Sequence, residues 1–341
     1  IAARRRYFLP LLPDRTVATG IPAVAPHIRI MQEHRISHRE HRELGDVRWL
    51  RDYDSALQQA SQSGRPILLQ FQEVPGCSTC VNYGRDSLSH PLMVELIEQH
   101  FVPLAIFNNH PGDDARILSK FGEAAWNNPV AYVLDSEGTP LLPRLANRYG
   151  GLDLHRYLAA ALERLGIVVP GYFSLLGGDL ALAEDRAQTA TFETPCFWSG
   201  ETSLAQFVGV ISTDAGWVGG EEVVQVRFDP THLPPQELVE YARKEGFRAV
   251  GNAGFSLDKD PQFYLKKHKA RHLPLTAAQR TRLNVAIPYG DAIDEFLSPH
   301  QRAWLADDRL TQVSANDAYR QDFSTTWHQL DRALPARTKG S

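Results

Sequence analysis

Three cysteines are the residues in this chain whose type and spacing favour chemistry. Cys77 and Cys80 are separated by two residues, and Cys196 stands alone much further along the chain. A dithiol at this spacing can close into a small disulfide ring and open again, and a lone thiolate can attack an electrophilic atom. We therefore expect two thiol sites that exchange electrons or act on a common substrate.

Composition restricts the class of protein that carries these thiols. The 341 residues are 43% hydrophobic and 22% charged, with a net charge of −4. These values predict more than one globular domain, and they argue against a nucleic-acid partner. The sequence contains no run of about eighteen apolar residues, so we predict no membrane span. Three cysteines are too few for a secreted disulfide framework, so we predict a cytoplasmic protein. The periplasm stays an alternative because the chain begins at Ile1 without a methionine.

Residues 1–46 are predicted to form an N-terminal arm, since prolines interrupt them repeatedly. A short polar helix is expected over 31–41, with His34, His38 and His41 on one face. Histidines at this spacing can bind a metal, but a solvated polar face is the favoured interpretation.

Secondary-structure signals become regular from residue 47 and continue to residue 166. Apolar runs and helical periodicity alternate, and the Cys77 motif comes directly after the first strand. We expect helices over 54–61, 90–99, 115–121 and 152–165, and strands over 66–72, 101–107, 128–135 and 140–144.

The predicted position of the dithiol assigns a role to each sulfur. A thiol at a helix N-terminus faces free backbone N–H groups and the positive end of the helix dipole, so Cys77 should be the attacking thiolate. Cys80, one turn into the helix, should be buried and resolve the mixed disulfide. The alternatives are an inert cysteine pair or a soft-metal site, although zinc would need two further ligands that the spacing does not supply.

The order of elements over 47–166 resembles the thioredoxin fold, which implies an α/β domain. The string Val-Pro-Gly-Cys at 74–77 is similar to a bacterial thioredoxin-like group in which selenocysteine often occupies the position of Cys77. The resemblance also implies that Pro129 is the cis-proline that faces the dithiol.

A linker is predicted over 167–188 and a second domain over 189–290. The second domain opens with a strand over 189–194 that leads into Cys196, and a helix is expected over 201–208. Cys196 would thus also lie where a helix begins. Phe197 and Trp198 beside it suit a substrate with a compact apolar group next to an electrophilic atom.

The segment Pro-Cys-Phe-Trp-Ser-Gly-Glu at 195–201 resembles methionine sulfoxide reductase A, and similarity continues through 209–220 and 222–230. The resemblance implies an α+β domain in which Cys196 attacks a sulfoxide sulfur and becomes a sulfenic acid. It also implies that Phe197 and Trp198 receive the methyl group. Glu201 matches the glutamate of the motif, with a structural or a catalytic role. Trp217 replaces a tyrosine that hydrogen-bonds the sulfoxide oxygen.

Two departures from this family concern the proton donor and a late tyrosine. The segment that carries the family's acidic donor is deleted, so Glu222 or its neighbour Glu221 is the candidate to protonate the departing oxygen. Tyr264 is the candidate for the late tyrosine. We predict a helical C-terminal extension over residues 291–335. It contains no motif that we can interpret.

The sequence therefore predicts a thiol-dependent oxidoreductase. Cys196 would reduce a sulfoxide-type substrate, either a protein or a small molecule, with electrons from Cys77 and Cys80 or from an external thiol. A peroxidase or disulfide reductase acting at Cys77 is the first alternative, and a soft-metal-binding redox module is the second. No cofactor other than the redox-active cysteines is expected, because no nucleotide fingerprint is present.

Overall fold

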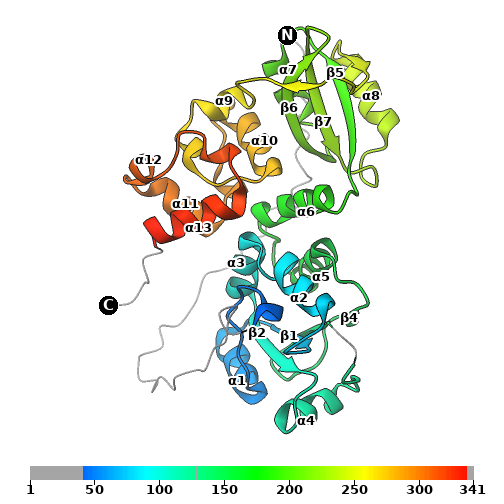
Figure 1. The fold of residues 1–341 in the computed structure, drawn as a ribbon, viewed down its shortest axis with the longest axis vertical. Coiled ribbons are helices and arrows are strands. Elements are labelled where there is room, and N and C mark those ends of the chain that lie inside the picture. The colour runs from blue at the N-terminus through cyan, green and yellow to red at the C-terminus, as the bar shows by residue number, and fades with distance from the viewer. Residues whose placement is uncertain (1–40, 127–128, 336–341) are drawn as a thin grey trace.

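The computed structural model describes residues 41–126 and 129–335, and it divides into two units that differ in sheet topology (Figure 1). Within these ranges, no helix has the length and apolar character needed to cross a membrane. Of the predicted polar helix with its three histidines, His34 and His38 lie outside the described residues.

The first unit is a four-stranded sheet with helices on both faces. Its strand order is β2-β1-β3-β4, with β1 parallel to β2 and antiparallel to β3. The strands are β1 (Ile67–Gln72), β2 (Val102–Phe107), β3 (Val130–Leu134) and β4 (Leu145–Ala146). The helices are α1 (Tyr53–Ser63), α2 (Ser78–Asp86), α3 (Pro91–His100), α4 (Asp113–Lys120) and α5 (Gly151–Arg164).

Alternation of side chains along β1 explains why this strand is buried at every position. Ile67, Leu69 and Phe71 belong to a core shared with α1 and α4, whereas Leu68 belongs to the core under α3 and α5. A strand covered on both faces is expected to be a continuous apolar run. The predicted α/β architecture of this unit is confirmed.

The second unit is a five-stranded antiparallel sheet in the order β8-β5-β7-β6-β9. The strands are β5 (Gln188–Glu193), β6 (Val210–Val218), β7 (Glu221–Phe228), β8 (Arg248–Val250) and β9 (Ser256–Leu257). The helices are α7 (Phe197–Leu204), α8 (Pro235–Lys244), α9 (Phe263–Lys266) and α10 (Ala277–Ala286). The predicted helix over 201–208 therefore begins earlier, directly after Cys196.

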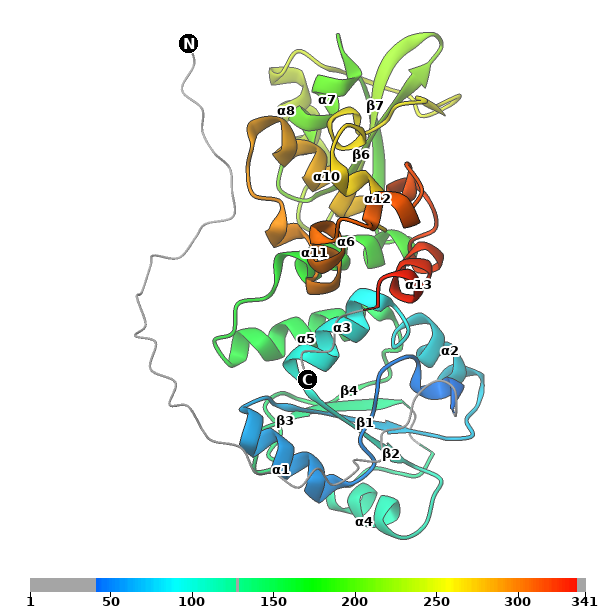
Figure 2. The same cartoon turned by 90° about the vertical axis from the view of Figure 1, so that its left-hand side faces the viewer.

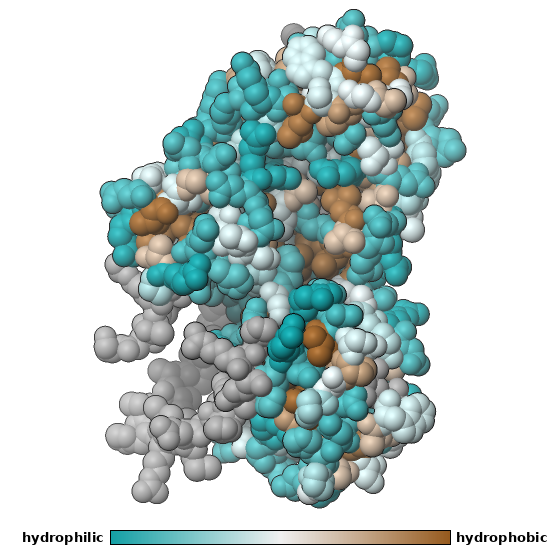
Figure 3. Space-filling model, viewed as in Figure 1, coloured by the Kyte–Doolittle hydropathy of each residue, from teal (hydrophilic) through white to brown (hydrophobic). Residues whose placement is uncertain are grey.

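Residues 167–188, predicted as a linker, mostly form a packed helix, α6 (Gly171–Ala183). Its Phe173 and Leu176 are fully buried in the core that also holds Leu162 of α5 and Leu283 of α10. The apolar side of α6 was not evident because a Pro-Gly and a Gly-Gly pair interrupt the segment, and these pairs usually mark loops. Apolar residues gather in the middle of the molecular face, around α6 (Figure 3).

The C-terminal extension joins the two units (Figure 2). Its helices are α11 (Pro299–Ala306), α12 (Leu310–Val313) and α13 (Phe323–Ala333). The His300 ring on α11 contacts the Glu95 carboxylate of α3 at 2.9 Å, and Phe323 stacks on His90 at 5.3 Å between ring centroids. Short 3-10 helices in the described chain are Arg42–Leu44, Lys269–His272, Ile287–Tyr289, Asp294–Phe296 and Ala318–Arg320.

Candidate active sites

The dithiol lies at the start of α2, immediately after β1. Cys77 is the N-cap residue and is exposed, whereas Cys80 is fully buried in the first turn of the helix. Both thiols are free, and their Sγ atoms are 4.0 Å apart. That separation is short enough for a disulfide to form after a small rotation of the side chains.

The two thiols of this site differ in acidity. A hydrogen bond from the backbone N–H of Cys80 lowers the pKa of Cys77. Burial raises the pKa of Cys80 to about 12. Cys77 is thus the accessible sulfur that ionises first, and Cys80 stays a thiol until a mixed disulfide forms beside it. An attacking role for Cys77 and a resolving role for Cys80 require this difference in accessibility and acidity.

Glu43, which lies in the predicted N-terminal arm, holds the loop that precedes Cys77. Its Oε1 accepts a hydrogen bond from the backbone N–H of Gly76 at 2.7 Å, and its backbone carbonyl accepts from Gln72 Nε2 at 2.9 Å. Gln72 Nε2 also donates to the carbonyl of Cys80 at 3.1 Å. Sequence reasoning missed this residue, because nothing in the pattern of the arm indicates contact with a loop about thirty residues away.

Glu73 is the residue that could complete a metal site at the dithiol. One ligand atom each from Glu73, Cys77 and Cys80 lie within 4.8 Å of one another. Two thiolates and a carboxylate are donors that zinc accepts, with a fourth position left open. The soft-metal alternative therefore has one more ligand than the cysteine spacing supplies, and it stays a prediction.

Pro129 precedes β3 and is buried. The predicted cis bond joins it to Asn128, which lies outside the described residues, so this expectation stays a prediction.

Cys196 occupies the equivalent place in the second unit, between β5 and α7. It is exposed and is the N-cap residue of α7. The backbone N–H of Phe197 donates to Glu222 Oε2 at 2.9 Å, so the carboxylate of Glu222 lies at the same helix N-terminus as the thiol. Glu222 is on β7 and is paired across the strands with Trp217 on β6. The thiol and a potential proton donor therefore share one end of the helix.

Four aromatic rings pack next to the start of α7. Phe197 is buried, with its centroid 5.4 Å from Trp198 and 5.2 Å from Trp217. Trp198 stacks on Phe263 at 4.1 Å, and its Nε1 is buried without a hydrogen-bond partner among the described residues. The predicted pair is thus half of a larger apolar cluster.

Phe263, and not the predicted Tyr264, is the late aromatic residue that reaches this cluster. Tyr264 lies beyond it, with its ring 5.4 Å from that of Phe263. Adjacent residues of a helix point in different directions, so an assignment one position out selects the wrong ring.

Trp217, predicted to hydrogen-bond a sulfoxide oxygen, uses its indole N–H within the protein. Nε1 donates to Asp258 Oδ1 at 3.1 Å. Asp258 is buried and also accepts from the backbone N–H of Asp260 at 2.7 Å. Asp258 was missed because the polar residues around it are also typical of a loop.

Glu201 is fully buried and connects α7, the helix that begins after Cys196, to two neighbouring segments. Its carboxylate accepts hydrogen bonds from the backbone N–H of Ala215 at 2.9 Å and of Gln262 at 3.1 Å. Burial raises the pKa of Glu201 to about 8. These contacts tie α7 to β6 and to the segment that carries Asp258 and Phe263. The structural role is therefore the one that the contacts support.

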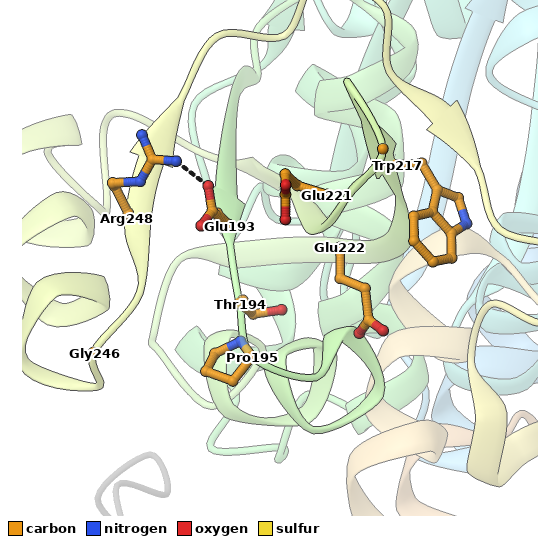
Figure 4. Close-up of a pocket in the computed structure, with 9 residues that line it drawn as sticks. Glu193, Thr194, Pro195, Trp217, Glu221, Glu222, Gly246 and Arg248 are labelled. Atoms are coloured by element: carbon orange, nitrogen blue, oxygen red, sulfur yellow. Dashed lines mark hydrogen bonds and ion pairs between the residues drawn. The ribbon is translucent and has the colours of Figure 1, made fainter.

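A polar pocket of about 440 Å³ adjoins Cys196 (Figure 4). It is lined by Glu193, Thr194, Pro195, Trp217, Gly220, Glu221, Glu222, Gly246 and Arg248. Two of these residues directly precede Cys196 in the chain, and Glu222 also contacts the start of α7. The pocket thus continues the thiol site toward the β6–β7 turn.

The two thiol sites are in different units. In Figures 1 and 2, α2 belongs to the lower unit and α7 to the upper one, with α6 and the C-terminal helices between them. One core runs through α5, α6, α10 and α11, so this arrangement is packed throughout. Direct exchange between Cys77 and Cys196 of the same chain has no support in this arrangement.

Comparisons with known proteins find two separate similarities, one to thioredoxin-like proteins and one to methionine sulfoxide reductases. A family profile described as thioredoxin-like matches residues 48–142. A peptide methionine sulfoxide reductase MsrA of Haloquadratum walsbyi is 25% identical over 154 residues, covering 39% of this chain and 87% of the relative. The MsrA of Vibrio vulnificus is 32% identical over 114 residues, covering 28% of this chain and only 54% of the relative. These similarities support a thiol-dependent oxidoreductase.

A solved structure described as the DsbH oxidoreductase also aligns, with a TM-score of 0.31 and 18% identity over 37% of this chain and 89% of that chain.

Proposed function

We propose that the protein reduces methionine-type sulfoxides, with Cys196 as the nucleophile. The observation that carries this proposal is the exposed Cys196 thiol at a helix N-terminus, next to both a carboxylate and an aromatic cluster. The thiol supplies the electrons, the carboxyl group of Glu222 supplies a proton, and the rings accommodate a methyl group. The similarity to MsrA proteins supports the same chemistry.

The first step transfers oxygen from the sulfoxide to the cysteine. The Cys196 thiolate attacks the sulfoxide sulfur while Glu222 protonates the sulfoxide oxygen. The oxygen then moves from the substrate sulfur to the Cys196 sulfur. The substrate S–O bond and the transient S–S bond both break, so the sulfide leaves and Cys196 becomes a sulfenic acid. The substrate sulfur gains two electrons and the cysteine sulfur loses two.

The second step returns Cys196 to the thiol. A reductant thiolate attacks the sulfenic acid, water leaves, and a mixed disulfide forms, which a second thiol then cleaves. Cys77 and Cys80 have the acidity and spacing for these two roles. Because the two sites are in separate units, we assign the dithiol of a second copy, or an external dithiol, as the reductant.

Turnover of free methionine sulfoxide with dithiothreitol tests this function, with methionine measured by chromatography. Wild-type protein should form methionine, and Cys196→Ser should not. Wild-type protein with fully titratable thiols that reduces neither sulfoxide epimer would overturn the proposal.

A mixing experiment tests the source of electrons. Cys77→Ser and Cys196→Ser proteins, each inactive with a reductant that recycles only the Cys77–Cys80 disulfide, should together recover turnover. No recovery on mixing would exclude a second copy as the reductant and leave an external dithiol.

Disulfide reduction at Cys77 is a second candidate function, favoured by the exposure and lowered pKa of this thiol. It predicts that Cys196→Ser still reduces a small disulfide such as oxidised glutathione, whereas Cys77→Ser does not. A dithiol that is inert toward disulfides would remove this candidate.

A further inference from the structure

The polar pocket beside Cys196 carries three carboxylates and one guanidinium, from Glu193, Glu221, Glu222 and Arg248 (Figure 4). From this pocket we infer that the enzyme prefers a polypeptide in which a lysine or arginine stands next to the oxidised methionine. The inference rests on the proposed function and adds the class of substrate that the Cys196 site selects.

The position of the pocket makes it a site for a neighbouring residue. Thr194 and Pro195 line it and directly precede Cys196, and Glu222 contacts both the pocket and the backbone N–H of Phe197. An extended peptide advances about 3.3 Å per residue, so a sulfoxide held at Cys196 brings the adjacent side chain to the pocket.

The chemistry of the lining suits a cation. Glu193 is paired with the guanidinium of Arg248, so this wall already holds the type of group that we propose as its ligand. Glu221 faces the same pocket and is exposed. Without Glu222, which serves the proton transfer, the pair of glutamates outweighs Arg248 by one negative charge. Carboxylates form their strongest hydrogen bonds with charged N–H donors.

Thr194 adds an acceptor that has no hydrogen-bond partner within residues 41–126 and 129–335. The residue is only 4% exposed, and its Oγ1 is buried. The residue lines the pocket, with its hydroxyl oxygen directed to the side of Glu222 in Figure 4. A buried hydroxyl without a partner costs free energy, and an N–H group of a bound lysine or arginine would remove that cost.

Other neighbours of the oxidised methionine fit the pocket less well. An acidic side chain would meet Glu193 and Glu221 and be repelled. An apolar side chain would displace water from carboxylates without supplying a hydrogen bond, which is unfavourable. The order of preference should therefore be basic first, then neutral, then acidic.

Competing short peptides measure this preference. Three peptides that differ only in having Lys, Gln or Glu after the methionine sulfoxide are reduced together at low salt, and the ratios of kcat/KM are read from product masses. We expect the Lys peptide to exceed the Glu peptide by about two- to fivefold in kcat/KM, the size expected of partly exposed ion pairs. The ratio should fall as salt screens the charges.

Two variants and one control assign the effect to the pocket. Glu221→Gln should reduce the ratio, and Arg248→Ala should increase it, because the internal cation no longer occupies Glu193. Glu240→Gln, on the exposed face of α8, removes the same charge elsewhere and should leave the ratio unchanged.

Equal kcat/KM for the three peptides, or a ratio that Glu240→Gln lowers as much as Glu221→Gln, would overturn the inference. Free methionine sulfoxide would still be reduced in that case, so the proposed function would stand. Failure to reduce both the peptides and free methionine sulfoxide would overturn both.

Discussion

The two thiol sites have the same place at a helix N-terminus and opposite surroundings. Cys77 has a second sulfur 4.0 Å away and contacts with polar groups of its own loop. Cys196 has no cysteine nearby among the described residues, but it is next to four aromatic rings and the carboxylate of Glu222. The place at a helix N-terminus is common to both sulfurs, so the neighbours of each sulfur decide what it can do. The dithiol suits reversible disulfide exchange, and the lone thiol suits attack on a substrate with an apolar group.

The strongest contrast comes from removing each nucleophile. With dithiothreitol as the reductant, Cys196→Ser should lower kcat for sulfoxide reduction by about 1000-fold or more, because the attacking atom is lost. Cys77→Ser should leave formation of the Cys196 sulfenic acid intact, since it is in another unit. Trapping with dimedone and mass spectrometry measures this single turnover. Equal loss in both variants would break the comparison.

Glu222→Gln separates proton transfer from binding. The amide keeps the shape of the side chain but cannot deliver a proton, so kcat should fall by about 100-fold or more with little change in KM. Glu240→Gln, on the exposed face of α8, is the matched control and should change kcat for free methionine sulfoxide by less than about twofold. Similar effects of both substitutions would remove Glu222 as the donor.

Alkylation at different pH values tests the unequal acidity of the dithiol. The pKa of Cys77 is lowered by a hydrogen bond from the backbone of Cys80, and burial raises that of Cys80 to about 12. In Cys80→Ser, the pH profile of iodoacetamide alkylation at Cys77 should therefore have its midpoint below 9.0. In Cys77→Ser, Cys80 should stay unmodified at pH 9. Rapid alkylation of Cys80 at that pH would contradict the assignment of a resolving role.

The smallest effect is expected at the contact between His300 of α11 and Glu95 of α3, which lies between the two thiol sites. A hydrogen bond to the carboxylate of Glu95 raises the pKa of His300 above 6.5. The stability from this pair is therefore full below pH 6.5 and is lost as the pH rises through the higher pKa of the folded state. The His300 side chain is 35% exposed, so solvent screening limits the loss to about 1 kcal/mol or less.

Urea unfolding at pH 6 and pH 8 measures this contribution. The difference between the two pH values should shrink in His300→Gln and persist in His328→Gln, which changes an exposed histidine of α13. If His300→Gln keeps the full difference in unfolding free energy between pH 6 and pH 8, the His300–Glu95 pair does not stabilise the contact between α11 and α3.

Patterns within the sequence determined the thiols and the elements that present them. Buried strands appear in the sequence as apolar runs, and each cysteine motif comes soon after a strand, β1 or β5. The helix starts at Cys77 and Cys196 were therefore predictable from local order. Local order also explains where α10 begins, because Thr276 forms a complete capping box with Gln279. These features depend on interactions between residues close in the chain, which a pattern can record.

Tertiary structure alone decided which distant groups meet the thiols. Glu43 reaches the loop before Cys77, and Asp258 and Phe263 reach the Cys196 site, although none stands near a cysteine in sequence. The packing of α6 and the C-terminal helices also sets the two sites apart, where a flexible linker would have let them meet. Side-chain contacts across such separations depend on how helices and sheets pack, and local periodicity contains no record of that packing.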